Sequence, residues 1–225
     1  MNEVLKLENL TKHYINNQEE IEVLNNINLS VYESETISIQ GISGVGKTTL
    51  LNLIGGFDSP TSGKIFIENQ DITEMDETEL SYLRNRKIGY IFQSFYLLEE
   101  LNILENIILP ALKLGTPKPE AIDRAYEIAE FIGIEKRLKH YPSEISGGEK
   151  QRAAIARAII NNPKIICADE PTGNLDSKHK RIISELLFSI VEKNKQTLIL
   201  VTHEEDLAKK CNSRYLIENC SLIKN

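Results

Sequence analysis

Apolar runs of strand length alternate with amphipathic stretches over most of the chain. Four runs contain many β-branched side chains, and a polar or glycine residue follows each of them closely. The two most uniformly apolar runs are typical of parallel strands that are buried on both faces. We therefore predict an α/β fold with a mixed, mainly parallel sheet. The four predicted strands are residues 36–40, 87–92, 164–169 and 197–202.

The two ends of the chain show a different pattern, in which apolar and polar positions alternate. Residues 3–7 and 22–32 alternate as antiparallel strands do, with a polar turn at 16–20 between them. Residues 64–68 are predicted to form another strand, and residues 214–224 a hairpin. We expect residues 3–7 and 22–32 to form antiparallel strands.

Helical periodicity fills much of the remaining chain. Residues 121–132 repeat apolar side chains at helical spacing, and residues 177–193 form another amphipathic helix. Residues 76–84 begin with acidic residues and end with Arg84, which suits the helix macrodipole. The pattern is also helical from 103 to 140, where we expect three prolines to break it: Pro110, Pro117 and Pro119.

Composition and charge exclude several classes of protein. Of the 225 residues, 41% are hydrophobic and 26% are charged, which is ordinary for a globular protein. The net charge of −7 argues against nucleic acid as a partner, because proteins that bind phosphate backbones usually carry a basic surface. No apolar run approaches the roughly 20 residues that span a bilayer, and the first residues do not resemble a signal peptide. The three cysteines are too scattered for a zinc site or a disulfide framework.

The segment Gly41–Thr49 fits the phosphate-binding pattern G-x-x-x-x-G-K-[ST]. A predicted strand precedes it, and a short helix that ends at Gly55 follows it, which is the context this pattern requires. Glycines let the backbone wrap closely around phosphate oxygens, and the N–H groups of the loop attract anions. Lys47 is expected to reach the β- and γ-phosphates, and the Thr48 hydroxyl to bind Mg²⁺. A chance glycine turn before an ordinary helix is the alternative interpretation.

Polar side chains follow the predicted strands at the ends where ligands bind in an open parallel sheet. Asp169 is expected to hold Mg²⁺, and Glu170 to polarise the attacking water as a general base. Gln93 can orient water or complete the metal shell, and His203 can hydrogen-bond the γ-phosphate or the general base. Taken singly, each of these residues has a simpler interpretation. Asp169 and Glu170 could be an acidic pair exposed to solvent, Gln93 a glutamine with no special role, and His203 a structural histidine.

A helix is predicted to begin at Gly147, because Ser146 and Glu149 form a capping box. Gly147 and Gly148 stand together in its first turn, where each destabilises the helix by about 1 kcal/mol relative to alanine. A capped helix that packs through its alanines does not explain this pair. We expect some group to approach the backbone closely at this point.

Together these motifs resemble the nucleotide-binding subunit of ATP-binding cassette (ABC) transporters across nearly the whole chain. The order that carries the resemblance is Gly41–Thr49, Gln93, Ile145–Gln151, Ile165–Glu170, Asn174–Asp176 and His203. The resemblance implies a P-loop NTPase fold with a RecA-like core, an N-terminal antiparallel β-subdomain and an inserted α-helical subdomain. It implies one domain over 1–225, with the core and β-subdomain at about 1–93 and 163–225, and the helical subdomain at about 94–162.

The resemblance also implies roles for individual residues in an ATPase that uses ATP and Mg²⁺ and works as a head-to-tail dimer enclosing two ATP molecules. Tyr14 is similar to the aromatic residue that stacks on adenine, although its position also suits a half-buried strand-end side chain. Ser146 and Gly148 resemble the residues that close over the γ-phosphate of the second subunit, and Asp176 lies in the loop that couples the two sites. The implied nucleotide-binding set is Tyr14, Ser43, Gly44, Gly46, Lys47, Thr48, Thr49, Ser146, Gly147, Gly148 and Asp176. The implied metal ligands are Thr48, Gln93 and Asp169, and the catalytic set is Glu170, His203, Gln93 and Lys47.

Three positions depart from the common pattern of the family. Ile145 and Glu149 replace the commoner Leu and Gln of the signature, and Val45 replaces a Ser in the phosphate loop. Glu149 fits the capping box, but its charge must face away from the phosphates. None of these changes affects Lys47, Asp169, Glu170 or His203, so we still expect an active ATPase.

The motifs are most similar to the branch that contains lipoprotein-release, macrolide-export and peptide-antibiotic-export ATPases. This similarity implies a separate membrane permease as partner, and a cytoplasmic, peripheral location on the inner face of the cell membrane. The alternative is a regulatory ATPase that signals through a membrane partner to cell-wall hydrolases. The apolar run Phe95–Leu98 is a candidate docking surface for the permease, and burial within the helical subdomain is its alternative.

Overall fold

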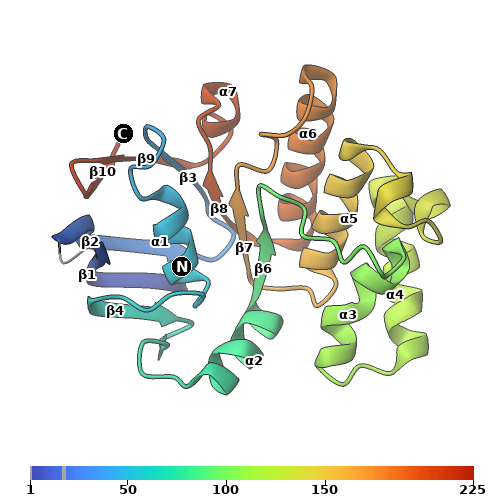
Figure 1. Ribbon diagram of the computed structural model, residues 1–225, viewed down its shortest axis with the longest axis horizontal. Helices are drawn as coiled ribbons and strands as arrows, with labels where there is room; N and C mark the ends of the chain where they lie inside the picture. The colour runs from blue at the N-terminus through green and yellow to red at the C-terminus, as the bar shows by residue number, and fades with distance from the viewer. Residues whose placement is uncertain (1, 17–18) are drawn as a thin grey trace.

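A six-stranded sheet runs through the middle of the protein in the order β10-β9-β3-β8-β7-β6 (Figure 1). The computed structural model describes residues 2–16 and 19–225. Every neighbouring pair in this sheet is parallel except β9 and β10, so the prediction of a mixed, mainly parallel sheet is confirmed. The strands are β3 (Thr36–Gln40), β6 (Ile88–Ile91), β7 (Ile165–Asp169), β8 (Thr197–Val201), β9 (Ser213–Glu218) and β10 (Ser221–Lys224).

A second, antiparallel sheet is formed by β2 (Glu19–Tyr32), β1 (Glu3–Asn16), β4 (Ser62–Ile67) and β5 (Gln70–Asp71), in that order. Its first two strands extend well beyond the predicted segments and into the expected turn at 16–20, of which residues 17 and 18 lie outside the described structure. His13 pairs with Glu22, and Ile15 with Glu20, across this extension. The alternating apolar signal is lost there because the hairpin projects from the core and exposes both faces.

Within residues 2–16 and 19–225, seven α-helices connect the strands (Figure 1). The short helix α1 packs between the two sheets, since Leu50 and Leu53 share one apolar core with residues of both. The helices α3, α4 and α5 form a helical block beside β6 and β7, and they share one apolar core with α6 and these strands. The helices are α1 (Lys47–Ile54), α2 (Glu77–Lys87), α3 (Ile103–Lys113), α4 (Lys118–Ile132), α5 (Gly147–Ile159), α6 (Ser177–Asn194) and α7 (Glu205–Ala208).

One predicted helix break is wrong. Pro110 lies inside α3, which continues to Lys113. Burial on one face of α3, including Ile107 and Ala111, outweighs the missing N–H, and the amide of Asn85 donates to the Pro110 carbonyl at 2.9 Å. By contrast, Pro117 and Pro119 stand at the start of α4, where proline is well tolerated.

The central strands are buried on both faces, as their apolar sequences predict. Side chains of β7 alternate between two cores: Ile165 and Cys167 pack with α1, whereas Ile166 and Ala168 pack with α3 to α6. At β6 the helix α5 lies directly on the strand, because a Cβ on Gly89 would stand 2.4 Å from the carbonyl oxygen of Ala158. These contacts fix the carboxyl ends of the parallel strands along one edge of the sheet.

Candidate functional site

The phosphate-binding segment lies between β3 and α1, at the carboxyl edge of the parallel sheet. A cavity of about 470 Å³ opens there. It brings the phosphate-binding segment together with the polar residues that follow β6, β7 and β8, as the sequence predicts. The cavity is lined by Gly41, Ser43, Gly44, Gly46, Lys47, Thr48, Thr49, Gln93, Asp169, Glu170 and His203.

Lys47 is the first residue of α1, and its ammonium group is held over the loop. Its Nζ donates to the carbonyl oxygens of Gly41 at 2.8 Å and of Ile42 at 2.9 Å. The N-terminal N–H groups of α1 have no partners within the helix, so they add positive partial charge beside this ammonium group. The combination suits a polyanion that carries several phosphate oxygens.

Asp169 ends β7 and is nearly fully buried. Its Oδ2 accepts a hydrogen bond of 2.9 Å from the Thr48 hydroxyl, which joins the helix after the loop to the strand end. Burial is the main cause that raises the pKa of this carboxyl, and the charge of Glu170 adds to the effect. A buried carboxylate beside a hydroxyl offers the oxygen ligands that Mg²⁺ prefers, and a cation there would compensate its desolvation.

Glu170 has a left-handed backbone, with φ of 44°, which is uncommon for a residue with a side chain. The peptide N–H of Glu170 donates to the Val201 carbonyl at 2.9 Å, so the neighbouring strand holds this conformation. Its Oε2 lies 2.9 Å from Nδ1 of His203, although the two groups are not aligned as a hydrogen bond. That buried oxygen has no hydrogen-bond partner among the described residues, so its capacity to accept a hydrogen bond or a proton is unused.

Gln93 is exposed in the lining of the cavity, two residues after the end of β6. Its carbonyl oxygen accepts a hydrogen bond of 2.8 Å from the Asn174 side chain. A Cβ on Gly173 would stand 3.5 Å from the Gln93 amide nitrogen. The loop after Glu170 therefore contacts Gln93 directly, which the sequence does not show.

Five predicted binding residues lie outside this cavity: Tyr14, Ser146, Gly147, Gly148 and Asp176. Ser146 and Gly147 are exposed at the start of α5, where Ser146 forms the predicted capping box with Glu149. The Glu149 carboxylate accepts from the Ser146 N–H at 2.8 Å and from Arg137 Nε at 2.7 Å. The hydrogen bond from Arg137 contributes most to lowering the Glu149 pKa to about 2, so this residue is an anion engaged within its own chain.

Gly148 is buried, and the group that approaches it belongs to the same chain. A Cβ at this position would stand 2.7 Å from Cδ2 of His179. Asp176 caps α6 through the His179 N–H, at 3.0 Å, and its other oxygen lies 2.6 Å from Nδ1 of the His179 ring. At Gly147 the nearest atom to such a Cβ is in Leu175, at 3.8 Å, which is ordinary contact.

The sequence profile of the ABC transporter family matches residues 24–173, which is more than half of the chain and includes most of the cavity lining. The chain belongs to the ABC transporter family. As a member, it is an ATP-binding subunit with ATPase activity.

Relatives of known name are similar over almost the full length of this ABC subunit. The lipoprotein-releasing system ATP-binding protein LolD of Wigglesworthia glossinidia brevipalpis is 48% identical, over 98% of this chain and 96% of that protein. LolD of Aquifex aeolicus is 46% identical, over 93% of this chain and 91% of that protein. Among solved structures, the dimeric post-hydrolysis state of the ATP-binding cassette MJ0796 bound to ADP and Pi superposes with a TM-score of 0.90. It is 38% identical in sequence, over 98% of this chain and 97% of that chain.

Sequence reasoning missed two residues that organise this ABC site. His179 was overlooked because nothing local marks a helix residue as the cover of a glycine some 30 positions away. Glu204 accepts hydrogen bonds from Thr172 at 2.9 Å and from Lys180 at 2.8 Å, and so ties the loop after Glu170 to the segment that contains His203. Only the position of Glu204 directly after His203 could have indicated that it belongs to the site.

Proposed function

We propose that the cavity binds the triphosphate of ATP, and that the residues lining it carry out hydrolysis in the roles predicted above. The observation that carries this proposal is the convergence of four strand-end segments on one cavity beside Lys47. We also propose the division into a core with its β-subdomain at 1–93 and 163–225 and a helical subdomain at 94–162. The block of α3 to α5 in Figure 1 supports that division.

The side chains divide the chemistry between them. Lys47 neutralises charge on the β- and γ-phosphates, and the loop N–H groups position the triphosphate. Thr48 and Asp169 would hold Mg²⁺, which supplies further neutralisation of phosphate charge when bound. Glu170, which lines the cavity and has one carboxylate oxygen without a hydrogen-bond partner among the described residues, accepts a proton from the attacking water. His203 lies beside that oxygen and can keep the carboxylate oriented or contact the γ-phosphate. Gln93, from the end of the neighbouring strand β6, positions the water.

A second copy of the chain completes the site in this proposal. Ser146 and Gly147 are exposed at a helix N-terminus and lie outside the cavity of their own chain, so they are free to meet the γ-phosphate held by a partner. The Asp176 carboxylate contacts the ring of His179, and that ring covers Gly148 in the same helical turn. Asp176 would contact the corresponding loop of the partner. The dimeric form of MJ0796, a similar cassette, supports a head-to-tail arrangement.

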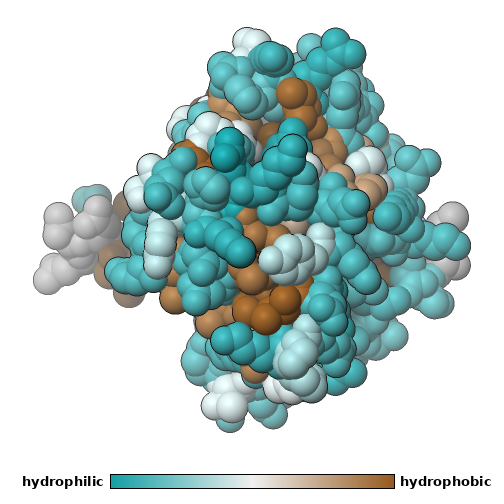
Figure 2. All heavy atoms as spheres, turned by 90° about the vertical axis from the view of Figure 1, so that its right-hand side faces the viewer, coloured by the Kyte–Doolittle hydropathy of each residue, from teal (hydrophilic) through white to brown (hydrophobic). Residues whose placement is uncertain are grey.

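The LolD relatives support lipoprotein release as the process that this subunit powers, through a separate membrane permease at the inner face of the cell membrane. Within the part of the chain that the structure describes, no helix has the length and apolarity required to cross a bilayer. Figure 2 shows the side of the molecule formed by the helical block, where apolar side chains reach the surface among polar ones.

The segment Phe95–Leu98 is partly exposed, as a docking surface for the permease would be, and partly buried within the helical block. Tyr96 is 65% exposed and Leu98 is 45% exposed, whereas Leu97 packs against the core of the helical block. The guanidinium of Arg157 donates to the Phe95 carbonyl at 2.7 Å and also to that of Tyr96, which fixes the segment. Tyr96 also lines a groove between β6 and α3 together with Phe92 and Leu109. We propose that this groove and the exposed Tyr96 receive the permease.

The test of the ATPase site uses two substitutions with different expected results. Glu170→Gln should retain ATP binding, slow phosphate release by about 10²–10⁴-fold and trap a dimer with ATP. Lys47→Ala should weaken ATP binding itself. Turnover at the wild-type rate in Glu170→Gln would remove Glu170 from its role. Purification of the native complex tests the permease, because isolation of the chain without any membrane protein would contradict this part of the proposal.

A further inference from the structure

Tyr14 is anchored by a network that the nucleotide site does not explain. Its hydroxyl donates to Oδ2 of Asp58 at 2.7 Å. The other oxygen of Asp58 accepts from Lys12 Nζ at 2.7 Å and from the Ser59 N–H at 2.7 Å. Lys12 Nζ also donates to the Ser59 carbonyl at 2.7 Å. Both carboxylate oxygens of Asp58 are therefore used, and the tyrosine is one of three groups that donate to them.

Burial and charge make this a strong anchor. The Lys12 side chain is only 11% exposed, which is unusual for lysine, and its ammonium group lies 4.7 Å from the centre of the Tyr14 ring. Burial opposes ionisation of Asp58, but hydrogen bonds from Lys12 and Tyr14 outweigh it and lower the pKa of this carboxyl. A hydrogen bond to an ionised acceptor is roughly twice as strong as a neutral one, so the ring has little freedom to turn.

The anchor connects Tyr14 to the element that carries the phosphate loop. Asp58 lies in the turn that follows α1, and α1 begins at Lys47. The same turn is joined to β1 by a hydrogen bond from the Thr61 N–H to the Thr11 carbonyl at 2.9 Å. The Tyr14 ring, which is 41% exposed, is thus held in a fixed position relative to the helix that receives the phosphates.

We propose that Asp58, held by Lys12, is a positioning residue that fixes Tyr14 as a stacking surface for the nucleotide base. Because the Tyr14 hydroxyl is already engaged by Asp58, the ring offers its face to the base and no hydrogen bond. Stacking tolerates any purine, so Tyr14 strengthens binding of ATP and GTP alike and does not distinguish them. This inference rests on the proposed nucleotide site and names what sets the affinity and the base tolerance of that site.

Nucleotide binding by the purified full-length chain tests the proposal, with ATP and GTP measured separately by calorimetry. Tyr14→Ala, which removes the stacking surface, should weaken both nucleotides by about tenfold or more. Tyr14→Phe and Asp58→Asn should each weaken both by about two- to tenfold, which is the usual effect of losing the pre-organisation of one side chain. The two changes combined should weaken binding no more than one alone, because they break the same contact. The rate of hydrolysis at saturating ATP should stay unchanged in Asp58→Asn, because this substitution leaves the residues that line the phosphate cavity intact.

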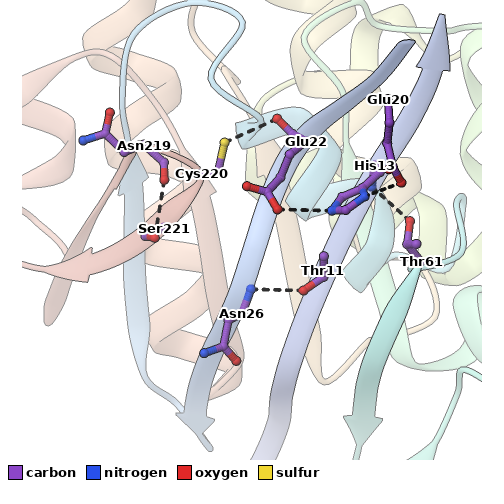
Figure 3. Close-up of polar contacts among 9 residues, drawn as sticks. All are labelled: Thr11, His13, Glu20, Glu22, Asn26, Thr61, Asn219, Cys220 and Ser221. Atoms are coloured by element: carbon purple, nitrogen blue, oxygen red, sulfur yellow. Dashed lines mark hydrogen bonds and ion pairs between the residues drawn. The ribbon is translucent and has the colours of Figure 1, made fainter. Parts of the chain in front are cut away.

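Two control variants disturb the same sheet without touching the anchor. Asp71→Asn breaks a comparable ion pair, in which Lys64 Nζ lies 2.7 Å from Asp71 Oδ2. His13→Gln changes the residue next to Tyr14, whose ring lies between Glu20 and Glu22 and whose N–H donates to Thr61 (Figure 3). Both should bind nucleotide as the wild type does.

The possible failures are distinguishable. Wild-type affinity in Tyr14→Ala would remove Tyr14 from the nucleotide site and overturn both the proposed role and this inference. Weak binding in Tyr14→Ala with wild-type affinity in Tyr14→Phe and Asp58→Asn would overturn the inference alone. A changed ratio of ATP to GTP affinity in Tyr14→Phe would show that the hydroxyl contacts the base, which also overturns it. If Asp58→Asn fails to fold, Tyr14→Phe carries the test, since it leaves the Lys12–Asp58 pair intact.

Discussion

The imidazole ring of His179 covers Gly148, and the Asp176 carboxylate holds that ring in place at 2.6 Å. Two motifs that lie some 30 residues apart are thereby joined within one subunit. The loop that contains Asp176 and the first turn of α5 cannot shift independently while this contact persists. In a head-to-tail dimer both would face the partner, so we expect them to respond to its nucleotide together.

The first prediction concerns the space under His179. Gly148→Ala places a methyl group 2.7 Å from the ring and should lower the melting temperature, because the ring cannot move without breaking its contact with Asp176. His179→Ala alone should have a small effect, and the double variant should regain much of the lost stability. Thermal unfolding of the four proteins without nucleotide measures this cycle. A double variant as unstable as Gly148→Ala would show that His179 is not the obstacle.

The second prediction concerns Glu149, whose pKa is lowered to about 2, chiefly by the hydrogen bond from Arg137. A carboxyl whose pKa is depressed on folding stabilises the protein above its unfolded pKa, and that stability is lost as pH falls toward the folded value. Glu149→Gln should therefore be less stable than the wild type above about pH 5, with a difference that shrinks toward pH 3. Urea unfolding across this range measures it. A difference that grows on acidification would contradict the assignment.

The third prediction concerns Asp169, whose pKa is raised mainly by burial. A carboxyl with a raised folded pKa destabilises the protein wherever it is ionised, so at pH 7 its charge opposes folding in the absence of a cation. Asp169→Asn keeps an acceptor for Thr48 and removes that charge. It should raise the melting temperature of the free protein while abolishing the dependence of ATP binding on Mg²⁺. A lower melting temperature, or unchanged dependence on Mg²⁺, would argue against the role of Asp169.

The fourth prediction concerns Asn106, which is 1% exposed in α3. Its side chain accepts from the Leu98 N–H at 2.8 Å and donates to the Leu98 and Leu101 carbonyls, each at 3.0 Å. Asn106→Ala leaves these backbone groups without partners and should destabilise the chain by about 1–3 kcal/mol. Urea unfolding measures the loss, and ATP binding to the folded fraction should stay at the wild-type level. A neutral effect would mean that the loop re-forms its bonds elsewhere.

Features with local causes could be predicted from the sequence. The apolar strand that ends at Asp169, the glycine-rich loop before Thr48 and the capping box of Ser146 each depend on neighbouring residues. The convergence of these segments followed from the parallel sheet, because parallel strands end along the same edge. The hydrogen bond between Thr48 and Asp169 joins two motifs that were each predicted to lie at that edge.

Features that depend on packing between distant segments could not be predicted. Pro110 remains inside α3 because one face of that helix is buried. The residues around Pro110 do not show that this burial outweighs the tendency of proline to end a helix. The hairpin of β1 and β2 extends past the predicted strands through cross-strand pairs of polar residues. The contact of His179 with Gly148 and the anchoring of Tyr14 by Asp58 likewise required the relative placement of whole elements.

The close backbone contact between α5 and β6 links the position of the strand to the position of the first turn of the helix. The helix rests on the strand backbone at Gly89 and Ala158 with no side chain between them, and Ser146 before its first turn is about 18 Å away along the axis. A slight tilt of the helix about this contact would therefore displace its first turn, together with the Asp176 loop that is joined to that turn through His179. One methyl group added at Gly89, on a strand remote from the first turn of α5, would thus change how that turn meets the partner subunit.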